Sequence, residues 1–236
     1  MDALTNCGLT VNGKLLSNYG GAALLDYSIG ETALKAETFQ GINRTSWRLL
    51  KAMFEQRKIE ITVVFTGENL HIAKLQRSKF NGDVFGRVEL FISDDGFFYD
   101  AVCTSFGAET LVGMGDKTAE IKSKYTFSGI RRGDLTSVTV ASGNKFFCRS
   151  TMPFTDCRVT ATVGTTGTNY NLWGAVFDSV TAGDVLVFDG IDGKITKNGV
   201  NAAASVSWVN FPALTPGENT NAAADAVTVE YYPTYI

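Results

Sequence analysis

The sequence predicts a mainly β protein made of two domains, and two observations carry this prediction. Val, Ile and Thr together account for 57 of the 236 residues, and their branched Cβ atoms favour extended backbone. Charged residues fall from 32 in the first 140 positions to 13 in the last 96, where the sequence becomes rich in Thr, Val, Gly and Ala, with a turn about every 10 residues. We therefore expect a β-domain with one helix over 1–136 and a β-sandwich over 137–236. One large β-sandwich is the alternative.

Strands in the first half follow from period-2 alternation. Residues 58–65 place apolar side chains on one face and mostly polar ones on the other, which predicts one core face and one wet face. Residues 88–92 and 97–102 flank Ser93-Asp94-Asp95-Gly96, a turn sequence with Gly where positive φ is required, so they are expected to form a hairpin. The apolar face of 58–65 consists of Ile59, Ile61, Val63 and Phe65, and the opposite face of Lys58, Glu60, Thr62 and Val64.

One helix is expected over 68–80, followed by Asn81-Gly82 as a stop signal. Its acid at the start and its bases toward the end suit the helix dipole. Residues 47–54 are ambiguous, since their apolar spacing fits a helical stripe whereas their length and context fit a strand.

The second half reads as an antiparallel sandwich. Its expected strands cover 158–163, 185–188, 195–196, 200–201 and 227–232, with turns at 189–194 and 197–199 between the middle ones. Residues 219–226 form a loop of small residues, a composition typical of mobile segments.

Composition excludes several classes of protein. The net charge is −3 and the pI about 5.3, so a basic nucleic-acid groove is not expected. The longest apolar runs are a few residues long, far short of the ~20 that cross a bilayer. Asp2 stands where a signal peptide carries bases, and we expect a protein folded in a cytoplasm with no membrane insertion. Cys7, Cys103, Cys148 and Cys157 match no zinc or redox spacing and are expected to be reduced, with a bridge between Cys148 and Cys157 as the alternative.

No catalytic constellation is found. His71 is the only histidine, so imidazole relays and multi-histidine metal sites are not expected, and its place is an exposed helix face. We therefore predict no enzymatic activity, no cofactor and no metal. The sequence identifies no catalytic, cofactor-binding or metal-binding residue, and the residues that form interfaces are unknown at this stage.

Three motifs only superficially suggest binding chemistry. Residues 189–193 resemble a calcium loop but lack its ligand spacing and distal Glu, and a hairpin turn explains them better. Residues 113–118 resemble a phosphate loop, yet Asp116 stands where Gly must precede Lys117. The sequon at Asn43 is expected to stay unmodified, and the adjacent carboxylates Asp94 and Asp95 fit a turn.

Aromatic residues are plentiful, with 16 Phe, 8 Tyr and 3 Trp. Most are expected in the two cores, and some could serve sugar stacking or subunit contacts. A protein that binds or assembles is therefore favoured over an enzyme.

Several segments together resemble the distal tail (Dit) proteins of long-tailed, siphovirus-type bacteriophages, and the resemblance runs over almost the whole chain. The resemblance rests on the order and spacing of these segments more than on any single segment. The segments are 9–13, 57–65 with the helix from Glu68, 88–102, 125–133, 155–159, 187–200, 211–220 and 227–236.

The resemblance implies a structural hub of the phage tail tip or baseplate. Its N-terminal domain would close a homo-hexameric ring, and its C-terminal domain would be a galectin-like β-sandwich facing outward. It implies as partners the tail tube protein, the tail-associated tip or lysin protein and, in some phages, receptor-binding proteins. DNA would pass through the ring without specific binding. The protein would lie at the distal end of the virion tail after assembly in the host cytoplasm, and residues 47–54 would be a strand.

A carbohydrate-binding module or adhesin for host attachment is the alternative function. It follows from the sandwich and the aromatic residues, of which Trp173 and Trp208 lie in the second half. The sole His lies in the other domain, so the residue pattern of a true galectin site is not met.

Overall fold

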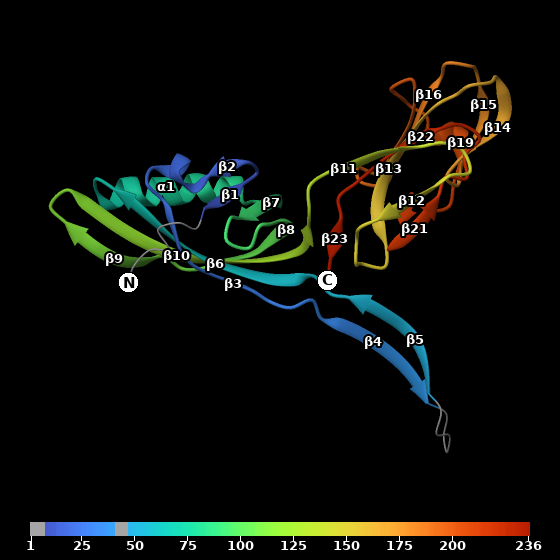
Figure 1. The fold of residues 1–236 in the computed structure, drawn as a ribbon. Coiled ribbons are helices and arrows are strands. Elements are labelled where there is room, and N and C mark those ends of the chain that lie inside the picture. Colours follow the sequence, from blue (N-terminus) through green and yellow to red (C-terminus); the bar gives the residue numbers. More distant parts are fainter. Residues whose placement is uncertain (1–7, 41–46) are drawn as a thin grey trace. The chain divides into compact units, whose positions relative to one another are not determined.

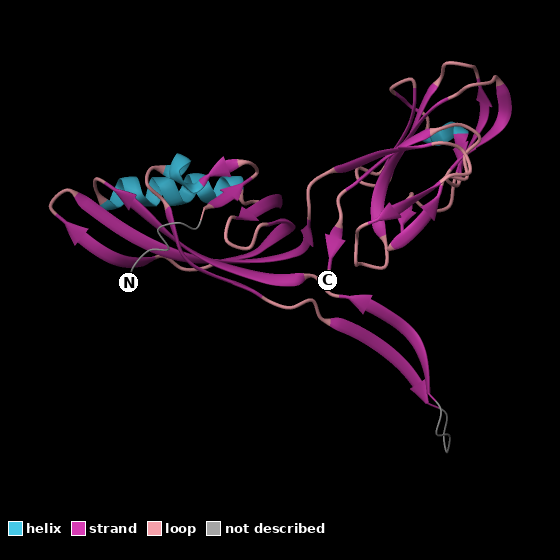
Figure 2. Cartoon of the chain, viewed as in Figure 1, coloured by secondary structure: helices cyan, strands magenta, loops and turns pink. Residues whose placement is uncertain are grey.

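The chain folds into two compact units that are almost entirely β (Figure 1). A computed structural model describes residues 8–40 and 47–236, with side chains described outside 39–52. The first unit comprises Met1–Arg132 with Ile236, and the second comprises Gly133–Tyr235. Figure 2 shows strands throughout and one long helix, which confirms the predicted fold class. The predicted domain ranges, 1–136 and 137–236, stay a prediction.

The first unit is built on an antiparallel sheet with the strand order β2-β1-β7-β8-β10-β6-β3. Its longest strand, β10, also pairs with β9, beyond the end of β8. A separate two-stranded sheet joins β4 to β5. The strands are β1 (Leu9–Val11), β2 (Lys14–Leu15), β3 (Ala23–Ile29), β4 (Leu34–Gln40), β5 (Trp47–Phe54), β6 (Arg57–Gly67), β7 (Arg87–Ile92), β8 (Phe97–Phe106), β9 (Thr110–Gly115) and β10 (Thr118–Arg132).

Strand β6 confirms the alternation argument. All four residues of its predicted core face are fully buried, whereas Lys58 is exposed and Glu60 partly so on the other face. Val64 is the exception on the wet face, because it is also buried. The predicted 88–102 hairpin forms as β7 and β8, with Gly96 at φ 72° in the turn. Residues 47–54 form strand β5, as the family resemblance implied and against the helical alternative.

Helix α1 (Leu70–Asp83) is present, but both predicted ends are wrong. It begins after Asn69, whose Oδ1 accepts a hydrogen bond from the Ile72 amide at 3.0 Å. Glu68 therefore precedes the cap, and the first turn holds no acid and the last no base, so the dipole argument fails. The helix runs through Asn81-Gly82, because burial of Phe80 and Val84 in the core outweighs the low helix propensity of Gly.

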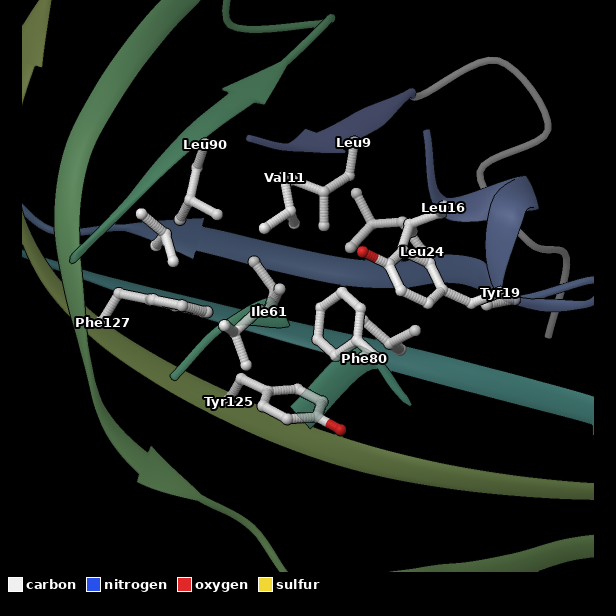
Figure 3. Close-up of a cluster of buried hydrophobic side chains, with 14 of the residues drawn as sticks. Leu9, Val11, Leu16, Tyr19, Leu24, Ile61, Phe80, Leu90, Tyr125 and Phe127 are labelled. Atoms are coloured by element: carbon white, nitrogen blue, oxygen red, sulfur yellow. The ribbon is translucent and has the colours of Figure 1, made fainter. Parts of the chain in front are cut away.

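Helix α1 lies along the sheet of the first unit (Figure 1), and residues of both meet in its core, among them Phe80, Ile61 and Tyr125 (Figure 3). Four aromatic rings meet there: Phe80 lies 5.2 Å from Tyr19, 5.6 Å from Phe65 and 4.9 Å from Tyr125, mostly edge to face. Such pairs add about 0.5–1.5 kcal/mol each beyond the buried area. The short 3₁₀ helix η1 (Leu16–Tyr19) contributes Leu16 and Tyr19 to this core.

The second unit is a β-sandwich, as predicted. One sheet has the order β11-β22-β13-β16-β17-β18, with β20 on β13, and the two smaller sheets are β12-β21 and β14-β15-β19. Its buried residues form a second core around Val159, Phe177, Phe188 and Tyr231. The elements are β11 (Thr136–Val140), β12 (Lys145–Cys148), β13 (Thr155–Thr162), β14 (Gly167–Leu172), β15 (Ala175–Val180), β16 (Val185–Asp189), β17 (Lys194–Lys197), β18 (Val200–Asn201), η2 (Ala203–Ser205), β19 (Val206–Ser207), β20 (Ala213–Leu214), β21 (Gly217–Thr220), β22 (Val227–Tyr231) and β23 (Thr234–Tyr235).

The expected turns of this unit are also present. Asn198 and Gly199 both have positive φ, 52° and 77°, which suits the tight link between β17 and β18. The predicted 219–226 loop begins inside strand β21, and it is tied down by Asn221, which is fully buried. No helix in the described ranges has the length and apolar character of a membrane-crossing segment.

Candidate assembly surfaces

The only histidine lies where the sequence placed it. His71 is exposed on α1, and within residues 8–40 and 47–236 no three His, Cys, Asp or Glu side chains gather as metal ligands would. The titratable groups with shifted pKa values belong instead to structural contacts.

Asp95 illustrates such a contact in the β7–β8 turn. It accepts a hydrogen bond from the Tyr99 hydroxyl and lies 3.3 Å from the Arg131 guanidinium. Burial, followed by the hydrogen bond to Asp95, raises the pKa of Tyr99 to about 12. Asp95 therefore holds the turn against β10, which leaves no free carboxylate pair with Asp94.

The calcium-like segment 189–193 is a hairpin turn. Asp189 is 3% exposed, and its Oδ1 accepts the Ile191 and Asp192 amides at 2.9 and 3.1 Å. Its Oδ2 accepts from Arg158 Nε at 2.7 Å. Both carboxylate oxygens of Asp189 are thus committed to the protein.

The phosphate-loop-like segment 113–118 is also a turn. It joins β9 to β10 and precedes no helix, so it lacks the amide cradle of a phosphate site. The sequon Asn43 lies outside the described residues. Cys148 and Cys157 are buried free thiols, and burial raises the pKa of Cys157 well above its usual range.

The hairpin of β4 and β5 is the first unpartnered surface. Its strands pair only with each other, from Leu34 opposite Phe54 to Gln40 opposite Trp47. Every described side chain of β4, from Leu34 to Thr38, is exposed, as is Met53 of β5. A two-stranded hairpin without a covering layer is marginally stable in water, so burial against another surface would stabilise this one.

Strand β9 is the second unpartnered surface. It pairs with β10 along one side, and its other edge pairs with no strand of the described chain. Leu111, Val112 and Met114 are 52%, 51% and 69% exposed. An open edge with apolar side chains is a template for pairing with another chain.

The wet face of the large sheet carries a carboxylate paired with two lysines. Glu60 lies 2.9 Å from Lys58 and 3.0 Å from Lys124, and the hydrogen bonds from these two ammonium groups lower the pKa of Glu60. Both ammonium groups are therefore held by a carboxylate of the same face, which weakens their attraction for a phosphate.

The two described tryptophans lie on the second unit. Trp173 is partly buried, 6.1 Å from Phe146, and donates to Asn221 Oδ1 at 3.3 Å, which makes it a core residue. Trp208 is 39% exposed and lies 4.6 Å from Phe211 at the side of a hollow of about 330 Å³.

Sequence reasoning missed the open edge of β9. The signal was present, because Thr110–Gly115 is an apolar run next to the Asp116-Lys117 turn, but we considered that turn only as a phosphate loop.

Comparisons with known proteins find a family model that matches part of the second unit and solved structures that match nearly the whole chain. Residues 151–235 match the model of the siphovirus-type tail component, C-terminal domain. The search of curated proteins finds no match.

Solved structures with 11% identity share the fold over nearly the whole chain. The crystal structure of the SPP1 Dit protein, described as a paradigm of the hub adsorption apparatus in phages that infect Gram-positive bacteria, matches with a TM-score of 0.68 over 98% of this chain and 99% of that one. Chains of the phage p2 baseplate in its activated conformation match with TM-scores of 0.54 with Sr and 0.55 with Ca, over 96% of this chain and 97% and 98% of theirs. By sequence, residues 151–235 match the family model of the siphovirus-type tail component, C-terminal domain, and the chain as a whole shares the fold of the SPP1 Dit protein.

Proposed function

We propose that this protein is the structural hub at the distal end of a phage tail, where six copies close a ring that joins the tail tube to the tail-associated tip protein. The observation that carries the proposal is the pair of unpartnered β surfaces on the first unit, the β4–β5 hairpin and the open edge of β9. The proposed location is the virion tail, and the proposed partners include receptor-binding proteins.

A closed ring explains why the single chain keeps these β surfaces unpaired. Each copy offers unpaired backbone groups and exposed apolar side chains, and rotational symmetry lets every copy satisfy those of its neighbour without leaving a free end. Edge pairing alone is too small for a stable interface, which buries roughly 800 Å² per partner. The hairpin supplies additional area.

Passage of DNA without specific binding fits the charge distribution. The first 140 residues hold 16 bases and 16 acids, and Lys58 and Lys124 of the sheet are both paired with Glu60. Tight binding of DNA would require several uncompensated Lys or Arg side chains facing phosphates.

Native mass spectrometry of the full chain, alone and with purified tail tubes, tests the proposal. We expect a six-fold species alone or on the tubes. Met114→Lys should weaken assembly by about five- to thirtyfold, because it puts a charge on the open edge, where an interface contact is worth about 1–2 kcal/mol. Val200→Lys is the matched control, because Val200 is equally exposed at 69% but lies on β18 of the second unit. A chain that stays monomeric and fails to add to tail tubes would contradict the proposal.

A further inference from the structure

A hollow of about 330 Å³ lies on the second unit, within the size range of small-ligand sites. The hairpin of β17 and β18 forms one wall, with Lys194, Thr196 and Asn201 along it. Trp208 and Phe211 form the other wall. All of these residues belong to one compact unit, so the hollow does not depend on the ring.

The aromatic wall is fixed in place from behind. The Phe211 ring lies 5.7 Å from Phe188, which is fully buried in the core, and the Trp208 ring lies 4.6 Å from Phe211 with a 44° tilt. Trp208 nevertheless stays 39% exposed. A large aromatic ring held in position and open to solvent is a platform on which an apolar ligand face can stack.

The opposite wall offers hydrogen-bonding groups that the protein does not use. Asn201 Oδ1 accepts the Ala203 amide at 3.0 Å, whereas its amide NH₂ has no partner in the described chain. The Thr196 hydroxyl likewise makes no hydrogen bond to the described residues. An apolar side chain of a docking protein would leave both groups desolvated and unpaired, whereas a ligand with hydroxyl groups would pair them.

The charges around the hollow further restrict the class of ligand that it can bind. No Asp or Glu lines the hollow, and its one cation, Lys194, lies 3.3 Å from Asp192 Oδ2 and is partly neutralised. Residues 141–236 hold 5 bases and 8 acids, so an anionic ligand would be repelled by the unit as a whole. The hollow is therefore suited to an uncharged ligand.

From these features we infer that the Trp208 hollow binds a neutral saccharide, with one pyranose ring stacked on the indole and its hydroxyl groups bonded to Thr196 and Asn201. A pyranose has one face of C–H groups and an equatorial rim of hydroxyl groups, which matches a wall of aromatic rings opposite a wall of free polar groups.

A glycan array that displays neutral and anionic glycans tests the inference, followed by titration of the full chain with the strongest neutral glycan by tryptophan fluorescence and amide NMR. We expect binding to neutral glycans, with shifts at 194–201 and at the Trp208 indole N–H. Trp208→Ala should weaken binding at least tenfold, and Asn201→Ala should weaken it several-fold.

Two further variants keep the test decisive. Phe147→Ala is the control, because Phe147 is 67% exposed on β12 and does not line the hollow, and it should leave the affinity unchanged. Trp208→Phe keeps an apolar ring if Trp208→Ala fails to fold, and it should weaken binding less than the alanine variant. An array without neutral hits, or an affinity unchanged by both Trp208 variants, would overturn the inference and leave the ring proposal intact.

Discussion

One buried amide, Asn221, organises the loop that precedes the last long strand of the second unit. Its Nδ2 donates to the Val140 and Asp225 carbonyls at 3.0 Å each, and its Oδ1 accepts the Ala223 amide at 3.0 Å and Trp173 Nε1 at 3.3 Å. All four of its hydrogen-bonding positions are therefore occupied while its exposed fraction is zero. A segment whose small residues suggested mobility is anchored by this single side chain.

Replacing this amide should be costly. We expect Asn221→Ala to lower the free energy of unfolding by about 2–3 kcal/mol, because it leaves buried donors and acceptors unpaired. Urea unfolding followed by fluorescence measures this change. Asn210→Ala, at an exposed position, should change it by less than about 0.5 kcal/mol. Equal effects of the two substitutions would show that Asn221 does not anchor the loop.

A second single residue, Asp184, makes the stability of the protein depend on pH. Hydrogen bonds from the Thr181 amide, Lys197 and Asn198 lower its pKa to about 2. Because the folded pKa lies below the unfolded value, this contribution to stability is present above about pH 4 and is lost as the pH falls toward 2.

Carboxyl NMR titration should therefore find Asp184 titrating near pH 2. In Lys197→Met, its pKa should rise toward the ordinary value near 4, since one hydrogen bond and one charge are removed. A pKa near 4 in the parent protein would mean that these bonds do not form in solution.

At the scale of elements, the sequence predicted the features that hydrophobic periodicity determines. Strand β6 and the β7–β8 hairpin follow from alternation and from one turn Gly, because a two-residue period places every other side chain in the core. The predicted ends of α1 were wrong. At the C-terminal end, burial of Phe80 and Val84 in the core outweighed the local stop signal at Asn81-Gly82. Periodicity describes faces, whereas helix ends depend on what the rest of the fold covers.

The start of α1 provides a direct measurement. Asn69→Ala should destabilise the protein by about 1 kcal/mol, because the Ile72 amide loses its cap. Glu68→Ala, one residue before, should have little effect, since Glu68 lies outside the first turn. Thermal unfolding of both variants compares them, and a larger loss for Glu68→Ala would restore the dipole interpretation.

The assembly surfaces could be predicted only in part for the same reason. The high strand content implies that the sheets have edge strands, but the strand order decides which of these edges stay unpaired. Strand β9 is open because β10 extends beyond β8, a long-range register that local patterns do not encode. The Trp208 hollow likewise joins residues 193–211 through sheet pairing that composition could not reveal.

At the scale of the whole molecule, the central claim is that the protein works by assembly. The first unit supplies the unpartnered β surfaces, and the second unit contains the residues that match the family model and the Trp208 hollow. Each unit has its own buried hydrophobic core, and the open edge of β9 belongs to the sheet that carries the core of the first unit.

The most direct test is cryo-electron microscopy of intact phage particles that carry this chain. The account predicts density for the chain at the distal end of the tail tube, in six copies, with the β4–β5 hairpin and the β9 edge in contact with neighbouring chains. Particles in which the chain is absent from the tail end, or is present there with both surfaces facing solvent, would contradict it.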